Sequence, residues 1–266
     1  MLTESFQSIA IAARQALRNW RSMIVLTTLY GFLIAALYLF VTIREASTAQ
    51  VFLSLALVIT APFLFFVLQA AGACEIESAR LLLREALRGW WKLLVVSLPL
   101  IALAIALIYL FGKAQTYFVA GSQLNELAAQ YQPNAGKPGL SWTEVLLTGL
   151  RYLALGLVLP LLAMHLWIAS VGRGFTKTLR SLNKVIVGAF APYSVLIYMA
   201  GFLVFGVAPY LVLFKPTPSS IAWMEFSLFV ARLLLVFVLT LFGWVLTMRA
   251  LAISARGRRE DLVENS

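Results

Sequence analysis

Two glutamate–arginine pairs lie inside apolar stretches of the chain, where ionised side chains are costly. Glu144 precedes Arg151 by seven residues, and Glu225 precedes Arg232 by the same interval. Seven residues of a helix return to within about 20° of the same face and advance about 10.5 Å along the axis. Each pair therefore shares one stripe of a helix. The two charges of a pair are too far apart for an intrahelical salt bridge, which needs a spacing of three or four residues.

The chemistry of these pairs suits an anionic ligand. If Arg151 and Arg232 face inward together, they form an electropositive cavity for a carboxylate, a phosphate or a lipid headgroup, and Glu144 and Glu225 lie at its mouth. Alternatively, each arginine reaches the nearer membrane surface with its long side chain, or pairs with another helix. His165, the only histidine, lies 14 residues beyond Arg151 and near the same stripe. We expect it either to pack as a satisfied polar residue or to couple proton binding to function.

Six apolar runs must position these residues. Of the 266 residues, 62% are hydrophobic and 12% are charged, far from the balance of a soluble domain. Runs of about 20 residues, the length that crosses a bilayer as a helix, lie near residues 23–42, 50–71, 93–112, 145–170, 187–212 and 224–248. Their apolar residues are continuous rather than alternating, which excludes strands of a barrel. The sequence therefore predicts an all-α integral membrane protein with six transmembrane helices.

The basic residues predict the orientation. Most of the 21 lysines and arginines fall at the two termini and in the connections that lie on the same side as the termini. By the positive-inside rule, both termini are cytoplasmic, as in a multi-pass protein of a cytoplasmic-type membrane such as the bacterial inner membrane. The formal net charge of +10 borders the spans, so it indicates anionic lipid rather than nucleic acid as the partner.

Three similar segments precede the first, third and fifth spans. Each contains Leu-Arg, a second basic residue three or four positions later, and then the start of a span: RQALRNWRSMIV (14–25), REALRGWWKLLV (84–95) and TKTLRSLNKVIV (176–187). Apolar residues recur at helical spacing before each Leu-Arg, with charged residues on the other face. This pattern predicts amphipathic helices in the membrane interface, which we call elbows 1, 2 and 3. Their expected interface residues are Arg18, Arg88, Arg180, Trp20, Trp90 and Trp91.

The elbows predict a threefold internal repeat within a single membrane domain, residues 1–266. Each unit is an elbow, an outward helix, an outer loop and an inward helix. The units run from about 3 to 71, 73 to 171 and 172 to 248, and residues 249–266 form a polar cytoplasmic tail. Gly188, Gly201 and Gly206 in the fifth span suit close helix packing.

Catalysis has little support in the sequence. The only aspartate, Asp261, lies in the polar tail, and one histidine with one cysteine, Cys74, is too few for the usual zinc site. No serine-nucleophile or phosphate-binding motif is present. We expect a protein that is not an enzyme and that needs no metal or cofactor.

Two classes of function are consistent with these features. The first is a transporter or binder of an anionic solute or lipid, which the glutamate–arginine stripes favour. The second is a noncatalytic scaffold or accessory subunit that binds another membrane protein. The expected partners are membrane lipids, especially anionic ones, and another membrane protein or a second copy of the chain.

Overall fold

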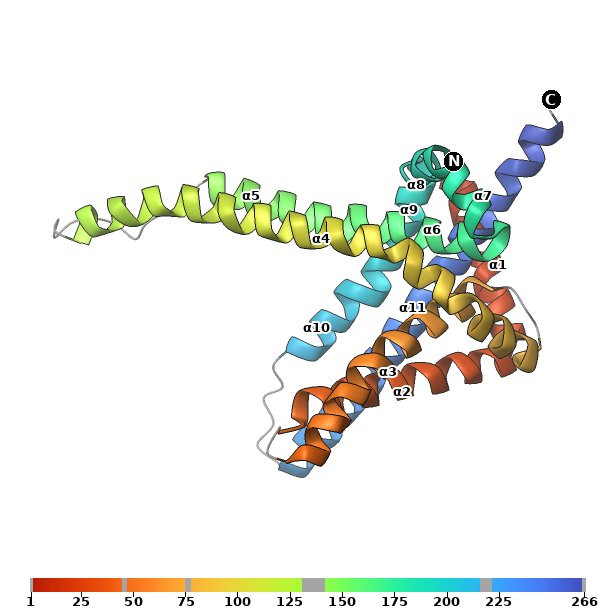
Figure 1. Ribbon diagram of the computed structural model, residues 1–266, viewed down its shortest axis with the longest axis horizontal. Coiled ribbons are helices and arrows are strands. Elements are labelled where there is room, and N and C mark those ends of the chain that lie inside the picture. Colours follow the sequence, from red (N-terminus) through yellow and green to blue (C-terminus); the bar gives the residue numbers. More distant parts are fainter. Residues whose placement is uncertain (1, 45–46, 75–77, 131–141, 216–221, 265–266) are drawn as a thin grey trace. The chain divides into compact units, whose positions relative to one another are not determined.

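The computed structural model describes the backbone of residues 2–44, 47–74, 78–130, 142–215 and 222–264. Side chains are described for all of these except residues 2–4, 118–130, 144, 222 and 257–264. Every regular element in this part of the chain is a helix (Figure 1). The all-α class predicted from the sequence is confirmed.

The helices follow one another with short connections. In chain order they are α1 (Leu2–Arg18), α2 (Trp20–Thr42), α3 (Thr48–Ala73), α4 (Ala79–Gln130), α5 (Trp142–Leu153), the π-helix η1 (Ala154–Val158), α6 (Leu159–Arg173), α7 (Phe175–Arg180), α8 (Leu182–Ala189), α9 (Pro192–Phe202), the π-helix η2 (Leu203–Val207), α10 (Ala208–Phe214) and α11 (Ala222–Glu264).

In the part of the chain that the structure describes, six helical stretches are long and apolar enough to cross a membrane. They are Trp20–Thr42, Thr48–Ala73, Ala79–Tyr117, Val145–Arg173, Pro192–Phe214 and Trp223–Arg256. Each overlaps one of the six apolar runs in the sequence, so the predicted number of spans is confirmed. Large apolar side chains such as Phe32, Val41 and Ile59 are exposed on them. Such surfaces are rare on soluble monomers and suit contact with lipid.

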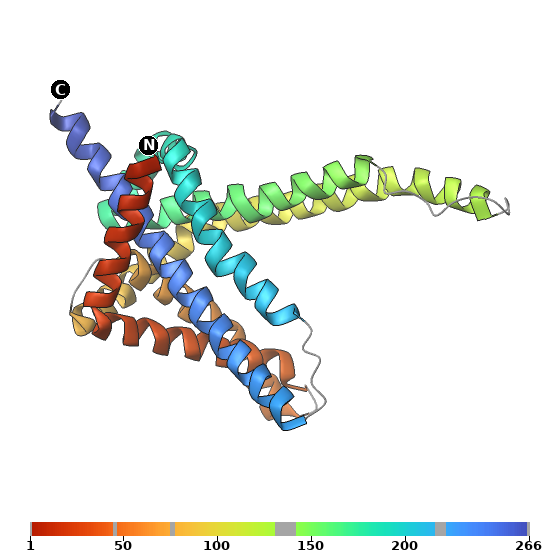
Figure 2. The same ribbon diagram turned by 180° about the vertical axis from the view of Figure 1, so that it is seen from behind.

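The chain forms two compact units. Unit 1 comprises residues 1–96 and 164–266, and unit 2 comprises residues 97–163. In unit 1, α2 and α3 form an antiparallel hairpin, and α11 packs against α1, α3, α9, η2 and α10 (Figures 1 and 2). In unit 2, the second part of α4 runs beside α5 and η1 (Figures 1 and 2). Helix α11 is thus the central element of unit 1.

The three elbows are helical, and all of them belong to unit 1. Elbow 1 is α1, which ends before Asn19, and elbow 3 is α7 with α8. Gly174, which precedes α7, has a φ of 84°, a conformation that glycine adopts without the cost of a Cβ. Elbow 2 is the first part of α4 and continues into its span without a break.

Two prolines explain the π-helical turns. Pro160 and Pro209 lack a backbone N–H, so a regular helix cannot continue through them unchanged. In each case the preceding residue, Leu159 or Ala208, donates its N–H to the carbonyl five residues earlier, which widens the turn.

The last helix extends into the predicted polar tail. Helix α11 is continuous to Glu264, and Arg249, Ala250, Leu251 and Ala252 are buried in unit 1. The first residues of this segment therefore belong to the packed core. The division into three repeat units stays a prediction.

Candidate functional site

Arg232 contacts the end of the neighbouring helix. Its Nη1 donates a hydrogen bond of 2.6 Å to the carbonyl of Lys215, the C-cap residue of α10. Carbonyls at a helix C-terminus have no partner within the helix, so this contact satisfies one of them. Glu225 is exposed in the first turn of α11, and in the described part of the chain it makes no ion pair with Arg232. The position of Arg232 is therefore accounted for without a solute.

Arg151 lies in α5 and is partly exposed. Among the side chains that the structure describes, it has no hydrogen-bond or ion-pair partner; the side chain of Glu144 lies outside the described residues. Arg151 belongs to unit 2 and Arg232 to unit 1. The cavity that the two arginines were expected to share stays a prediction.

His165 is buried in α6 and pairs with the start of α9. Its Nε2 lies 3.2 Å from Ser194 Oγ, and this hydroxyl donates to the carbonyl of Gly188 at 2.9 Å. Since the single hydroxyl hydrogen of Ser194 is used on Gly188, Nε2 of His165 must carry the proton and donate. The arrangement joins α6 to the α8–α9 turn and fits the packing alternative for His165.

The Leu-Arg motifs of the elbows have the same burial pattern. The residue before the leucine is buried in all three elbows: Ala16 is 2% exposed, and Ala86 and Thr178 are 0% exposed. The leucines are outward, with Leu17 75%, Leu87 44% and Leu179 50% exposed. The arginines that follow, Arg18, Arg88 and Arg180, are exposed as well. Each elbow thus docks on the bundle through a small side chain and presents a leucine and an arginine outward.

The pattern continues toward the spans. Seven residues after the buried position, Met23, Leu93 and Val185 are again buried. In elbow 2 the two positions share helix α4, and a spacing of seven residues keeps them on one face. In elbows 1 and 3 they lie in successive helices, α1 and α2 or α7 and α8. The second basic residues, Arg21, Lys92 and Lys184, are exposed or partly exposed.

The tryptophans expected at the interface take two roles. Trp20 and Trp91 are exposed, and the guanidinium of Arg21 lies 5.7 Å from the centre of the Trp20 ring. Trp90 instead packs edge-on against Phe63 of α3, with 5.1 Å between ring centres. Exposed Trp20 and Trp91 fit anchoring at the headgroup level, whereas Trp90 holds elbow 2 against the hairpin.

A buried polar pair was missed by the sequence reasoning. Gln69 of α3 is 3% exposed, and its Oε1 accepts a hydrogen bond of 2.7 Å from the indole Nε1 of Trp244 in α11. A cavity of about 160 Å³ lies beside this pair. The available signal was the amide itself, since Gln69 is the only asparagine or glutamine in the apolar run 50–71 apart from Gln50 at its first position. Buried polar groups in spans are rare and often functional.

Cys74 follows the end of α3 and is buried. Burial, with a smaller contribution from the negative charge of Glu85, raises the pKa of the thiol to about 11.

Because the thiolate is the reactive form, we expect N-ethylmaleimide at pH 8 to label Cys74 of the folded protein on the order of 100-fold more slowly than an ordinary thiol. The rate should rise about tenfold per pH unit toward pH 11. Mass spectrometry measures this directly, because Cys74 is the only cysteine. Protein unfolded in detergent should react normally, and rapid labelling of the folded protein at pH 8 would contradict the burial.

The class of protein follows from these features. Among the described residues, no three histidine, cysteine or acidic side chains are grouped as a metal site requires. Comparisons with known protein families, curated proteins and solved structures gave no match. Six long apolar helices with lipid-compatible surfaces define a polytopic, all-helical integral membrane protein.

Proposed function

We propose that this protein is a noncatalytic membrane protein that binds anionic lipid through its three elbows, in the cytoplasmic leaflet. The observation that carries the proposal is the shared register of the elbows, in which a buried small residue is followed by an exposed leucine and an exposed arginine. Elbows 1, 2 and 3 lie toward the end of unit 1 opposite the α2–α3 connection (Figures 1 and 2). One leaflet can therefore meet all three.

The exposed faces have the chemistry of interfacial helices. A leucine that enters the acyl boundary gains about 1.5 to 3 kcal/mol from leaving water. Each arginine or lysine near an anionic leaflet contributes about 1 kcal/mol. Each elbow carries two basic residues beside its leucine, as with Arg18 and Arg21 around Trp20. The elbows together therefore favour anionic over zwitterionic lipid.

This function explains the observations better than an anion transporter does. The side chain of Arg232 is engaged by the Lys215 carbonyl, so one of the two arginines of the proposed anion path already has a structural role. A scaffold role toward another membrane protein remains compatible with lipid-binding elbows. In both cases, the three repeat units serve to place the elbows on the same leaflet.

The test is native mass spectrometry of protein extracted from nanodiscs that contain equal amounts of phosphatidylglycerol and phosphatidylcholine. Wild-type protein should retain phosphatidylglycerol preferentially. The triple variant Arg18→Ala, Arg88→Ala, Arg180→Ala should reduce this preference at least about tenfold, because three contacts of about 1 kcal/mol are removed.

The matched control removes three positive charges from the connections expected on the other side of the membrane from the elbows. The variant Arg44→Ala, Lys113→Ala, Lys215→Ala has the same net charge as the elbow variant and should keep the lipid preference. Equal loss in both triple variants would mean that only net charge matters, and the proposal would be rejected.

A further inference from the structure

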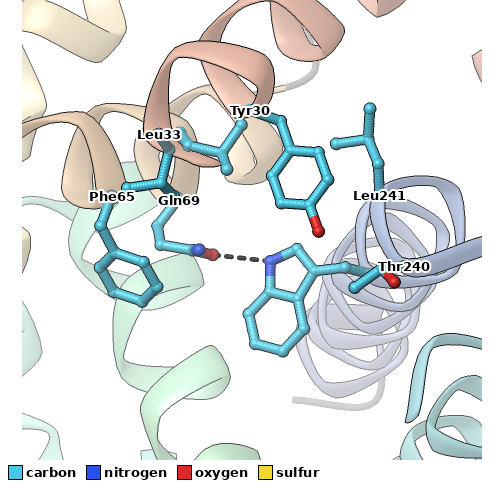
Figure 3. Close-up of a pocket in the computed structure, with 8 residues that line it drawn as sticks. Tyr30, Leu33, Phe65, Gln69, Thr240 and Leu241 are labelled. Atoms are coloured by element: carbon cyan, nitrogen blue, oxygen red, sulfur yellow. Dashed lines mark hydrogen bonds between the residues drawn. The ribbon is translucent and has the colours of Figure 1, made fainter. Parts of the chain in front are cut away.

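The cavity beside Gln69 lies between three helices of unit 1. It has a volume of about 160 Å³, is partly open, and is lined by α2, α3 and α11 (Figure 3). Tyr30, Leu33 and Phe65 form apolar walls on the side of the α2–α3 hairpin. A cavity of about 150 Å³ accommodates a benzene ring. The space therefore fits a ring-sized group or a short length of alkyl chain.

The amide of Gln69 lines this cavity, and only its oxygen is engaged in a hydrogen bond among the described residues. The indole of Trp244 can only donate, so it must face Oε1 of Gln69, and the amide Nε2 points elsewhere. Within the described part of the chain, Nε2 has no acceptor, although Gln69 is 3% exposed. Among the other polar side chains of the lining, Thr240 donates to the carbonyl of Val236 at 2.6 Å. An amide N–H without a partner in an apolar site is costly, so the cavity suits a ligand that brings an acceptor.

The depth of Gln69 identifies the acceptor. Helix α3 has 26 residues and is about 39 Å long, so it exceeds the hydrocarbon core of about 30 Å by a few ångströms at each end. Gln69 lies four residues before the end of α3 at Ala73, about 6 Å along the axis. That is close to the boundary between acyl chains and headgroups, where the ester carbonyls of phospholipids lie.

Elbow 2 packs next to this position. A Cβ built on Gly89 would lie 3.9 Å from the Cβ of Ala70, the neighbour of Gln69. The donor is thus in the same leaflet as the elbows. Below the boundary, an acyl chain continues into an apolar surrounding such as that formed by Leu33 and Phe65.

We propose that this cavity holds the part of one phospholipid acyl chain that lies next to its ester group. In this arrangement, Gln69 Nε2 donates a hydrogen bond to the ester carbonyl. The volume fits a short length of alkyl chain, and the Nε2 donor takes the carbonyl acceptor that such a chain carries at this depth. Recognition is of the ester and the chain rather than of the headgroup. It is therefore separate from the charge preference proposed for the elbows.

The experiment compares dioleoyl phosphatidylcholine with its diether analogue, which has the same headgroup and chains but no ester carbonyl. Protein is extracted from nanodiscs with equal amounts of both lipids, and the retained lipid is identified by native mass spectrometry. Wild-type protein should retain the ester lipid about fivefold more than the ether lipid, the ratio that one hydrogen bond of ordinary net strength supports. Gln69→Met should retain both lipids equally.

A cavity-filling pair of variants tests the position of the chain. Leu33→Trp fills the cavity and should abolish the preference for the ester lipid, whereas Leu37→Trp, one turn along α2 and exposed, should behave as wild type. Circular dichroism verifies that each variant is folded, and the wild-type ester preference is decisive even if Gln69→Met does not fold. Equal retention of ester and ether lipid by wild type, no retained lipid, or equal ester preference in the two tryptophan variants would each overturn the proposal.

The two lipid proposals fail separately. Both lipids here are zwitterionic, so loss of the elbow arginines should leave the ester preference unchanged. Conversely, Leu33→Trp should leave the phosphatidylglycerol preference of the elbows intact.

Discussion

Replacing Gly243 by valine is expected to lower the free energy of unfolding by about 3 kcal/mol and the melting temperature by roughly 10 °C. A Cβ at this position of α11 would lie 2.9 Å from Phe205 Cβ and 3.0 Å from the Phe205 backbone nitrogen in η2. The obstructing atoms belong to the backbone or are attached to it, so they cannot turn aside as a flexible side chain can. Helix α11 must then move away from η2, and the interhelical contacts that stabilise unit 1 are lost. Thermal unfolding in detergent measures the change.

A glycine in open surroundings supplies the control. Gly31 in α2 has no atom within 4 Å of a built Cβ and also lies in a span, so Gly31→Val changes helix propensity without a clash. Its melting temperature should remain within a few degrees of wild type. Gly201 in α9 faces Thr247 of α11 so closely that Gly201→Val should resemble Gly243→Val. If Gly31→Val and Gly243→Val were equally unstable, the loss would reflect glycine propensity rather than close packing.

Introducing a carboxylate at Ala86 should prevent folding, whereas the same change one residue later should be tolerated. Ala86 is fully buried on the docked face of elbow 2, and an unpaired buried charge costs several kcal/mol. Leu87 is 44% exposed, so Leu87→Glu keeps its charge at the surface. We expect Ala86→Glu to aggregate on extraction and Leu87→Glu to give a single folded species, as judged by size-exclusion chromatography and thermal unfolding.

The tolerated variant should still affect lipid binding. A carboxylate at position 87 lies next to Arg88 and repels anionic headgroups, so the retained phosphatidylglycerol should decrease while the fold persists. Ala86→Glu thus tests the face by which the elbow docks on the protein, and Leu87→Glu tests the face that contacts lipid. Equal damage by Ala86→Glu and Leu87→Glu would show that the burial register assigned to elbow 2 is wrong.

The six spans were predictable because crossing lipid imposes a local requirement. Each segment must satisfy its own backbone hydrogen bonds and remain apolar for about 20 residues, and both properties can be read within one window. The amphipathic pattern of the elbows is equally local, so their helical state was also accessible from spacing alone.

The face by which an elbow packs against the rest of the protein could not be predicted from spacing. The apolar stripe of α1 that includes Leu17 is outward, and the helix packs through Ala12 and Ala16 instead. Lipid solvates leucine as well as protein does, so close approach of small residues decides the packing.

The candidate sites depend on contacts between distant residues. Spacing predicted one stripe for Glu225 and Arg232, but it carried no information about the carbonyl of Lys215, which becomes the partner of Arg232 only when α10 ends beside α11. Gln69 and Trp244 are 175 residues apart, and each looks unexceptional in its own span. By itself, the sequence determined the membrane class, the six helices and the amphipathic elbows, since these follow from local periodicity. Only the tertiary structure decided which polar groups are paired and which amide lines a cavity, because both depend on how the helices meet.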